Sequence, residues 1–365
     1  RLVKHYIMAH TPMDRYQFAY QANRSTQDAL LCLTSTVTSF IDQKASHYAR
    51  CLFLDFSSAF NTIHVPDLIS QLTHLDSNVT EWIYSFLSNR VQRTVVDGKT
   101  SNAIITNTGT PQGCCLSPLL FSIYTNRITS NLSNVTIIKY ADDTCIIGCI
   151  ANQSDLNSYF DEIHRIAKQC ADLNLLLNPT KTQEMMLSTQ NVKPSTPTLV
   201  LNDTAIAFSD KVKYLGVLVD DKLRFNDHVH GIVSTASQRM YVVRNFVFLS
   251  SKSLSNMLFK SFIVSRISYC LPIIFKSLYA ADKQRLCKIF KDAIKLGIEH
   301  PDIYTMMDNQ TRTLALRYIH DEDHFINDLL SKCPSGRYRT VKHRSSLGRD
   351  CFLRHITLIL NEILF

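Results

Sequence analysis

The stretch Ile137-Ile-Lys-Tyr-Ala-Asp-Asp-Thr-Cys-Ile-Ile-Gly148 decides how this chain is expected to fold. Apolar residues flank a short polar centre, which is the pattern of a β-hairpin with Asp142 and Asp143 at its tip. Such a pair can be ordinary turn chemistry. Two adjacent carboxylates also repel each other, so a fold tolerates them where solvent or a cation neutralises the charge. The hairpin therefore predicts a displayed acidic pair.

Two upstream segments give this pair a context. Phe53-Leu-Asp-Phe-Ser-Ser-Ala-Phe60 overlaps an apolar run at 50–56 that reads as a buried strand, so Asp55 lies near the strand end. Alone, Asp55 would more often cap a turn than bind a metal. Gly109-Thr-Pro-Gln-Gly113 lies between the two acidic segments. Carboxylates from two strands are what Mg²⁺ needs beside phosphate oxygens, so the three segments in this order indicate a nucleotide-polymerising palm.

Several residues near these acids are candidates for nucleotide binding. Phe60 follows Asp55 by five positions, and a ring beside the sugar would exclude a ribose 2′-hydroxyl; a place in the core is the equal alternative. Ser58 and Ala59 are small, so the backbone there could approach a triphosphate. Gln112 offers an amide, and the helix beginning nearby favours phosphate.

The remaining pattern predicts an α+β chain with a change of character after Asn226. We expect one domain at 1–225, a helical domain at 226–300 and a basic C-terminal segment at 301–365. A surface connector is expected at 191–198. Predicted helices are 65–75, 79–87, 116–128, 156–170, 229–246, 254–267 and 282–296, the last ended by Gly297, and predicted strands are 184–187, 198–201 with a turn at Asn202-Asp203, and 213–219.

Composition limits the cellular setting. The chain has 365 residues, 45% of them hydrophobic, with 11 cysteines and a net charge of +8. No apolar run approaches the ~18 residues that span a bilayer, and no signal peptide opens the sequence, so we expect no membrane and a location in nucleus and cytoplasm. The scattered cysteines predict reduced thiols. Cys333, His343, Cys351 and His355 do not have the spacing of a zinc finger.

The motifs resemble the conserved blocks of reverse transcriptases of non-LTR (LINE-type) retrotransposons. The resemblance runs in family order over about 15–230. It is carried by Gln17-Phe-Ala-Tyr-Gln-Ala-Asn-Arg-Ser-Thr26, Asp55-Phe-Ser-Ser-Ala-Phe-Asn-Thr-Ile63, Asn107-Thr-Gly-Thr-Pro-Gln-Gly-Cys-Cys-Leu-Ser-Pro-Leu-Leu-Phe121, Tyr140-Ala-Asp-Asp143, Leu177-Asn-Pro-Thr-Lys-Thr182 and Tyr214-Leu-Gly-Val217.

This resemblance implies a right-hand polymerase fold, with an antiparallel-sheet palm, helical fingers elements and an all-helical thumb. It implies RNA-directed DNA polymerase activity with two Mg²⁺ ions, or Mn²⁺ in their place, and an RNA template, a DNA primer and dNTPs as partners. The residues it implicates are Asp55, Asp142 and Asp143 as metal-binding catalytic acids, Lys181 as proton donor to pyrophosphate, Arg24, Ser58, Ala59, Phe60, Gln112 and Gly113 around the nucleotide, and Tyr214, Leu215 and Gly216 as the turn that grips the primer end.

The sequence also departs from the family pattern. Gln21 stands where relatives usually carry Arg, which removes a cation from the fingers. The first fingers strands and the endonuclease of such elements are expected upstream of Arg1. The sequence does not indicate an oligomeric state.

Two basic regions lie outside the acidic motifs. Lys288, Lys291 and Lys295 share one helical face, which could follow phosphates or could simply be solvated. The segment 337–354 has basic residues around Tyr338 and is a candidate for contact with template RNA or single strands. The residues expected to contact the nucleic acid there are Arg337, Arg339, Lys342 and Arg344.

Three functions fit these patterns. The first is a reverse transcriptase that extends a primer with dNTPs. The second is a catalytically inactive RNA-binding relic of the element. The third is an RNA-dependent RNA polymerase, which would not be expected to place a bulky Phe60 beside the sugar.

Overall fold

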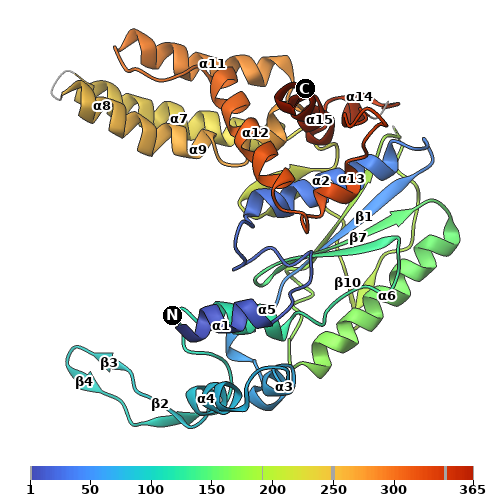
Figure 1. The fold of residues 1–365 in the computed structure, drawn as a ribbon, viewed down its shortest axis with the longest axis vertical. Coiled ribbons are helices and arrows are strands. Elements are labelled where there is room, and N and C mark those ends of the chain that lie inside the picture. Colours follow the sequence, from blue (N-terminus) through green and yellow to red (C-terminus); the bar gives the residue numbers. More distant parts are fainter. Residues whose placement is uncertain (1, 191, 248–250, 341–342, 365) are drawn as a thin grey trace. The chain divides into compact units, whose positions relative to one another are not determined.

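The computed structural model describes residues 2–190, 192–247, 251–340 and 343–364 (Figure 1). It contains both helices and strands, so the predicted α+β class is confirmed. The chain forms two compact units. The first consists of 1–24, 51–184 and 195–208, and the second of 25–50, 185–194 and 209–365. No helix in the described ranges is both long and apolar enough to cross a membrane.

A central hairpin organises the first unit. β6 (Val135–Tyr140) pairs antiparallel with β7 (Asp143–Ile150), and Tyr140 lies opposite Asp143, which leaves Ala141 and Asp142 as a two-residue turn. The hairpin predicted from the sequence is thus confirmed. The strand order of its sheet is β6-β7-β1-β8, with β1 at Tyr48–Leu54 and β8 at Gln183–Ser188.

One helix covers the hairpin strand that carries the acid. α6 (Gln153–Asp172) packs on β7 and places the Tyr159 ring directly over Gly148. A Cβ at Gly148 would come within 2.2 Å of that ring, so only glycine allows this approach. The Tyr159 hydroxyl donates to Glu184 Oε1 at 3.0 Å, which satisfies a phenol buried under the helix. The Tyr159 side chain therefore joins α6 to the sheet in two places, through its ring at Gly148 and through its hydroxyl at Glu184.

Short elements complete the first unit. Helices predicted at 65–75 and 116–128 exist but end earlier than expected, at Ser70 and Tyr124. The turn at Asn202-Asp203 is confirmed, since both residues have positive φ between paired strands. The short helices and strands of the first unit are α1 (Leu2–His10), η1 (Ala59–Asn61), α3 (Val65–Ser70), α4 (Ser77–Leu87), α5 (Ser117–Tyr124), β2 (Arg90–Gln92) paired with β5 (Ile104–Thr106), β3 (Val95–Val96) paired with β4 (Lys99–Thr100), and β9 (Val200–Leu201) paired with β10 (Thr204–Ala205).

The second unit is mostly helical. The predicted connector at 191–198 begins on Asn191, which lies outside the described residues, and the described part has no helix and no strand. The helices are α2 (Thr26–Ile41), α7 (Asn226–Val247), α8 (Lys252–Phe259), the π-helix η2 (Lys260–Val264), α9 (Ser265–Ile267), α10 (Leu271–Phe275), α11 (Ala280–Lys295), α12 (Ile303–Ile319), α13 (Ile326–Leu329), α14 (Ser346–Arg349) and α15 (Phe352–Leu364).

One strand prediction in this unit was wrong. The segment 213–219 is not a single strand but the hairpin of β11 (Lys211–Tyr214) and β12 (Val217–Asp220). The chain reverses at Leu215 and Gly216, whose φ values are 48° and 80°. Glycine adopts this conformation freely, and the turn allows the two short apolar strands to pair. Alternating apolar residues cannot by themselves reveal such a reversal.

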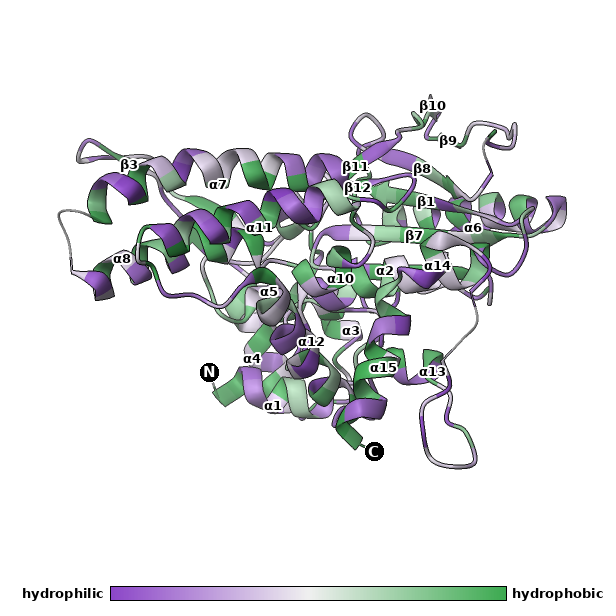
Figure 2. Cartoon of the chain, turned by 90° about the horizontal axis from the view of Figure 1, so that it is seen from above, coloured by the Kyte–Doolittle hydropathy of each residue, from purple (hydrophilic) through white to green (hydrophobic). Residues whose placement is uncertain are grey.

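The long helices pack through amphipathic faces. α7 contacts both α8 and α11, and α15 packs against α12. Figure 2 shows hydrophilic and hydrophobic residues alternating along α7 and α11. On α11, Leu286, Ile289, Phe290 and Ala293 are buried, as the helical spacing predicted. The helix predicted at 254–267 is continuous but is wound as a π-helix through η2.

Candidate active site

Three carboxylates meet at the end of the central hairpin. Asp55 follows β1, Asp142 lies in the turn between β6 and β7, and Asp143 begins β7. Burial raises the pKa of the Asp143 carboxyl, and the negative charges of Asp142 and Asp55 raise it further. Like charges raise a neighbouring pKa only at short range, so the three predicted carboxylates lie close enough together to influence one another. Asp142 and Asp143 are exposed as whole residues and Asp55 is half-buried, so the site opens to solvent, although the Asp143 carboxyl itself is partly desolvated.

The backbone around Asp55 is held by the segment that precedes β8. The Asn178 N–H donates to the Asp55 carbonyl at 2.9 Å, and the Asp55 N–H lies 3.4 Å from the Thr182 hydroxyl. The same segment places Lys181 Nζ 3.9 Å from the Asp55 carboxylate. The lysine side chain is 69% exposed, so this pair adds little stability. Lys181 is therefore a cation beside the acids that remains available to another anion.

The turn that carries Asp142 is conformationally constrained. Ala141 has a φ of 57°, a left-handed conformation that costs a non-glycine residue about 1 kcal/mol. The tight hairpin imposes this conformation, because its two strands determine the turn. Tyr20 lies nearby, since burial and then the charge of Asp142 raise the pKa of its phenol. The turn is thus bordered by the N-terminal segment.

A buried lysine behind the turn was not identified from the sequence. Lys139 is 1% exposed, and its ammonium lies 2.9 Å from the Asp14 carboxylate. Burial lowers the pKa of this lysine, although the Asp14 charge opposes that effect. Nζ also donates to the carbonyls of Ile128 at 2.9 Å, Thr125 at 3.2 Å and Asn126 at 3.3 Å. A lone lysine in an apolar strand was the only sequence signal.

The backbone of Lys139 also binds the N-terminal segment. The Phe18 N–H donates to the Lys139 carbonyl at 2.8 Å, and the Lys139 N–H donates to the Tyr16 carbonyl at 2.9 Å. Gln17 is fully buried between these bonds, and the Gln21 side chain donates to its carbonyl. Gln21, which stands where a cation was expected, therefore serves an internal contact. Arg24, at the end of this segment, is half-buried.

The predicted loop 109–113 packs on the segment that carries Phe60. The Thr110 N–H donates to the Phe60 carbonyl at 3.0 Å, and the Gly109 N–H donates to the Ile63 carbonyl at 2.8 Å. A Cβ at Gly109, whose φ is 69°, would lie 2.7 Å from the Asn61 Cα. No residue with a side chain fits there without displacing backbone. The two sequence motifs are therefore joined in space.

The Phe60 ring is only partly covered by its neighbours. It lies against Phe121 with ring centroids 4.5 Å apart and the ring planes tilted by 32°, yet Phe60 is only half-buried. Next to it, Ser58 is exposed with a φ of 55°, while Ala59 is 5% exposed. The structure thus supports a core contact and leaves part of the ring free for a ligand.

The tip of the loop is exposed. Gln112 and Gly113 are both accessible, and a Cβ at Gly113 would meet nothing within 4 Å. The base of the loop is fixed by Ser117 Oγ, which donates to the Pro111 carbonyl at 2.6 Å. Arg90, which the sequence did not single out, donates to the carbonyls of Thr108 and Gly109. The loop has a rigid base and a free tip.

The predicted primer-end residues form the β11–β12 turn of the second unit. Tyr214 and Leu215 are buried, and Gly216 is exposed. The Tyr269 hydroxyl donates to the Leu215 carbonyl at 2.6 Å and lies 2.9 Å from the Thr26 hydroxyl. The turn is therefore anchored to residues distant in sequence.

The predicted basic residues that the structure describes are all exposed on the second unit, and one of them, Arg344, also contacts the end of α2. Lys288, Lys291 and Lys295 are exposed on one side of α11. Arg337 and Arg339 are exposed, whereas Tyr338 between them is 8% exposed. The Arg344 guanidinium donates to the carbonyls of Asp42 at 3.2 Å and Ile41 at 3.3 Å. Lys342 lies outside the described residues.

The donor chemistry of the acid site suits a divalent cation. Carboxylate oxygens are the ligands of Mg²⁺, and mutual repulsion among the three acids is what a cation would relieve. Within the described ranges, no group of three or more His, Cys, Asp or Glu side chains is arranged so that it could hold a metal ion. Mg²⁺ commonly takes only one or two carboxylates and completes its shell with water and substrate phosphates. The residues present therefore fit an ion shared with a triphosphate.

Comparison with known proteins agrees with these motifs. Residues 1–219 match the family of reverse transcriptases (RNA-dependent DNA polymerases). The RNA-directed DNA polymerase from mobile element jockey of Drosophila melanogaster is 27% identical over 230 residues, covering 60% of this chain and 24% of the relative. The Pol polyprotein from type-1 retrotransposable element R1 of Bradysia coprophila is 25% identical over 280 residues, covering 72% and 26%.

The chain spans about a quarter of the length of these relatives. Among solved structures, apo telomerase from Candida tropicalis is similar with a TM-score of 0.43 and 10% identity, covering 87% of this chain and 57% of that chain.

Proposed function

This chain belongs to the reverse transcriptase (RNA-dependent DNA polymerase) family, and from that premise we propose that it extends a DNA primer with dNTPs on an RNA template, as part of a non-LTR retrotransposon protein. The observation that supports the proposal is that Asp55 directly follows β1, which lies beside β7 in the sheet, while Asp142 and Asp143 lie at the start of β7, so that the charges of Asp55 and Asp142 both act on the Asp143 carboxyl. We assign the palm with a remnant of the fingers to 1–225, the thumb to 226–300 and a basic nucleic-acid-binding segment to 301–365.

The three acids would hold two Mg²⁺ ions, with Mn²⁺ as a substitute. When bound, such ions lower the pKa of a primer 3′-hydroxyl and stabilise charge on the leaving group. The acids themselves would position the ions: Asp55 directly follows β1, while Asp142 and Asp143 come from the hairpin. Because the acids come from two strands of one sheet, their relative positions would stay fixed during phosphoryl transfer.

Neighbouring residues would bind the nucleotide. The accessible part of the Phe60 ring would lie against the sugar and exclude a 2′-hydroxyl. The exposed tip of the loop, with Gln112 and Gly113, and the small residues Ser58 and Ala59 would present polar groups to base and phosphates. Arg24 would neutralise triphosphate charge.

Lys181 would give a proton to pyrophosphate. It lies 3.9 Å from Asp55 and is largely exposed, so it can approach a leaving group held at the acids. The turn of Tyr214, Leu215 and Gly216 would contact the primer end. Lys288, Lys291, Lys295, Arg337, Arg339, Lys342 and Arg344 would contact the nucleic acid backbone. Such a protein would act in nucleus and cytoplasm.

Primer extension tests the proposal. The assay uses a labelled DNA primer on an RNA template with dNTPs and Mg²⁺. We expect Asp142→Asn to reduce incorporation by at least about 100-fold, on the order expected when charge stabilisation at the reacting phosphate is lost. Asp161→Asn is the matched control, because Asp161 is exposed on α6 of the same unit and carries the same charge.

Two outcomes would count against the proposal. Equal incorporation by wild type and Asp142→Asn would remove the acids from the chemistry. RNA binding without Mg²⁺-dependent incorporation by the wild type would favour the inactive relic instead.

A further inference from the structure

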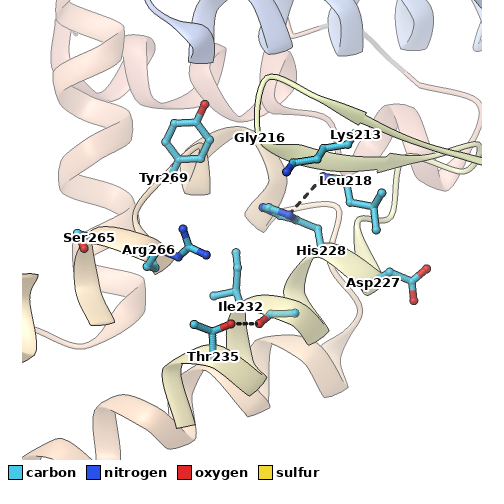
Figure 3. A pocket seen from close by; sticks show the side chains of 11 residues that line it. Lys213, Gly216, Leu218, Asp227, His228, Ile232, Thr235, Ser265, Arg266 and Tyr269 are labelled. Carbon is cyan, nitrogen blue, oxygen red and sulfur yellow. Dashed lines mark hydrogen bonds between the residues drawn. The ribbon is translucent and has the colours of Figure 1, made fainter. Parts of the chain in front are cut away.

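Two of the cavities differ in the chemistry of their walls. One, of about 660 Å³, adjoins the Gly216 turn assigned to the primer end, and Figure 3 shows polar side chains such as Lys213 and Arg266 along it. Another, of about 310 Å³, lies in the first unit and is lined by residues of α1, of α4 and of the loop that precedes α5. The wall of this smaller cavity is almost entirely apolar and includes two adjacent cysteines, Cys114 and Cys115.

Two aromatic rings of α4 form part of the apolar wall. Trp82 and Phe86 are one helical turn apart, and their rings stack with centroids 5.4 Å apart and planes within 5° of parallel. Trp82 is 47% exposed, so this pair presents apolar surface to solvent. Leu2 and Leu116 line the same cavity. Such a wall favours a ligand with an apolar chain, because binding removes both surfaces from water.

The start of α5 holds the sulfur of Cys114. The Leu116 N–H donates to Cys114 Sγ at 3.4 Å. Burial opposes ionisation, but hydrogen bonds from the N–H groups of Leu116 and Ser117, from the Ser117 hydroxyl and from the Cys115 thiol lower the pKa of the Cys114 thiol. Thiolate is the nucleophilic form of cysteine. Cys114 therefore carries more of the reactive form at neutral pH than an ordinary surface cysteine does.

Cys115 and Lys4 complete the group of polar side chains at the cavity. The Cys115 thiol donates to the Cys114 sulfur, so the two side chains lie in contact. Cys115 is exposed, whereas Cys114 is half-buried. Lys4 of α1 also lines the cavity and adds an ammonium to it. The cavity thus combines a nucleophilic sulfur, a cation and an apolar wall.

We propose that this cavity is a covalent binding site for an apolar α,β-unsaturated carbonyl compound, with Cys114 Sγ as the nucleophile. The thiolate forms a bond to the β-carbon, and the electron pair of the C=C bond moves toward the carbonyl oxygen. The proton that the thiol released then returns from water to the α-carbon, so no oxidant or second substrate is needed. The tail of the compound lies against Trp82 and Phe86. A strongly charged electrophile would place its charges against this wall, which is unfavourable.

The adduct would lie beside the tip of the loop proposed to bind the nucleotide. Cys114 follows Gln112 and Gly113, and Ser117, which contacts the Cys114 sulfur, also donates to the Pro111 carbonyl at 2.6 Å. A chain attached to Cys114 would restrict this tip, so modification should stop the incorporation of dNTPs. This consequence rests on the proposed function, whereas the covalent site does not.

Reaction rates at the two cysteines test the site. The protein, without dNTPs, is treated with methyl propenyl ketone or methyl heptenyl ketone, whose β-carbons carry a methyl and a pentyl group. Tandem mass spectrometry follows each cysteine with time. Burying one methylene strengthens binding about 4-fold, so the longer tail should raise the rate at Cys114 about 10-fold or more. Cys115 is the internal control, because it is adjacent but exposed, and it should react with both ketones at similar rates.

Two substitutions on α4 locate the tail. Trp82→Ala removes part of the apolar wall and should abolish most of the preference of Cys114 for the longer ketone. Tyr84→Ala is the matched control, because Tyr84 is 51% exposed on the same helix and lies outside the cavity. Iodoacetamide has no apolar tail, so it should modify Cys114 at the same rate in wild type and in both variants.

The outcomes decide both parts of the inference. Equal rates of the two ketones at Cys114 would overturn the covalent site, and so would a faster reaction of methyl heptenyl ketone at Cys115. At a dose that modifies Cys114 alone, wild type should lose primer extension while Cys114→Ser keeps it. Extension that survives full modification would contradict the blocking effect. A wild type that is inactive before treatment would count against the proposed function, and the rates at the two cysteines would still decide the site.

Discussion

The Lys139 ammonium lies 2.9 Å from the Asp14 carboxylate, and the lysine side chain is 1% exposed. This pair connects the N-terminal segment to the strand that leads into the acidic turn. Breaking a buried pair leaves an uncompensated charge, which costs about 3–5 kcal/mol. We expect Asp14→Ala to lower the free energy of unfolding by about 3 kcal/mol, toward the small end because three carbonyls still accept from Lys139.

Urea unfolding measures this effect. Asp67→Ala serves as the control, since Asp67 pairs with His64 at 2.9 Å where both side chains are 40% or more exposed. That exposed pair should contribute less than about 1 kcal/mol. A loss for Asp14→Ala no larger than that for the control would show that the buried pair is not an anchor.

Gly109 and Gly113 should respond differently to the same substitution. Both have positive φ, 69° and 79°, but only at Gly109 would a Cβ meet backbone, 2.7 Å from the Asn61 Cα. Gly113→Ala should cost about 1 kcal/mol, as expected for a left-handed alanine. Gly109→Ala carries the same strain plus a displacement of the loop, and we expect at least about 2 kcal/mol more. Thermal or urea unfolding compares them, and equal losses would contradict the contact.

Glu162 should give a pH-dependent contribution to stability. Hydrogen bonds from Arg165, and then from the Asn131 N–H and the Ser130 hydroxyl, lower the pKa of its carboxyl from 4.5 to about 2. A lowered pKa stabilises the folded state above the unfolded value, so the contribution is complete above about pH 4.5 and is lost as pH falls toward about 2.

The variant Glu162→Gln should be less stable than wild type by about 2 kcal/mol at pH 7, as for hydrogen bonds to a charged group. The difference should shrink as the pH is lowered through that window. Urea unfolding of both proteins between pH 7 and pH 3 measures it. A difference that does not change with pH would contradict the ionic role.

Phe60→Ala should relax sugar discrimination. The half-buried ring packs against Phe121 and remains partly accessible, so its removal opens space at the predicted sugar position. We expect the ratio of kcat/KM for dNTP to that for rNTP to fall about 10-fold or more. Phe56→Ala, in the same segment, is the control, and an unchanged ratio for Phe60→Ala would place the ring in the core alone.

Much of the acid site was predictable because its chemistry is local in sequence. The hairpin with Asp142 and Asp143 follows from alternating apolar and polar character, and the structure confirms it. The resemblance to reverse transcriptases of non-LTR retrotransposons is confirmed by the family match and by the relatives. The proximity of Asp55 and Lys181 depends on strand pairing, and the order of motifs only suggested it.

Other features depend on tertiary contacts that no pattern reveals. In the sequence, Lys139 is a single charged residue within an apolar strand. Only the folded structure shows its four partners, the Asp14 carboxylate and three backbone carbonyls. Apolar alternation predicted the reversal at Leu215-Gly216 as part of a strand, because the alternation is the same on both sides of the turn, and only the family resemblance implied a turn there. Helices α12 and α15 were not predicted, since the basic residues between them dominate the pattern of that region.

The pairing of Tyr140 with Asp143 has a consequence for changes in chain length. Side chains alternate between the two faces of a strand, so inserting or deleting one residue in β6 or β7 would turn every subsequent side chain to the opposite face. The acidic turn would then lie on the wrong face while the amino-acid composition hardly changed. Single-codon insertions and deletions within the hairpin should therefore abolish primer extension far more often than substitutions at the same positions.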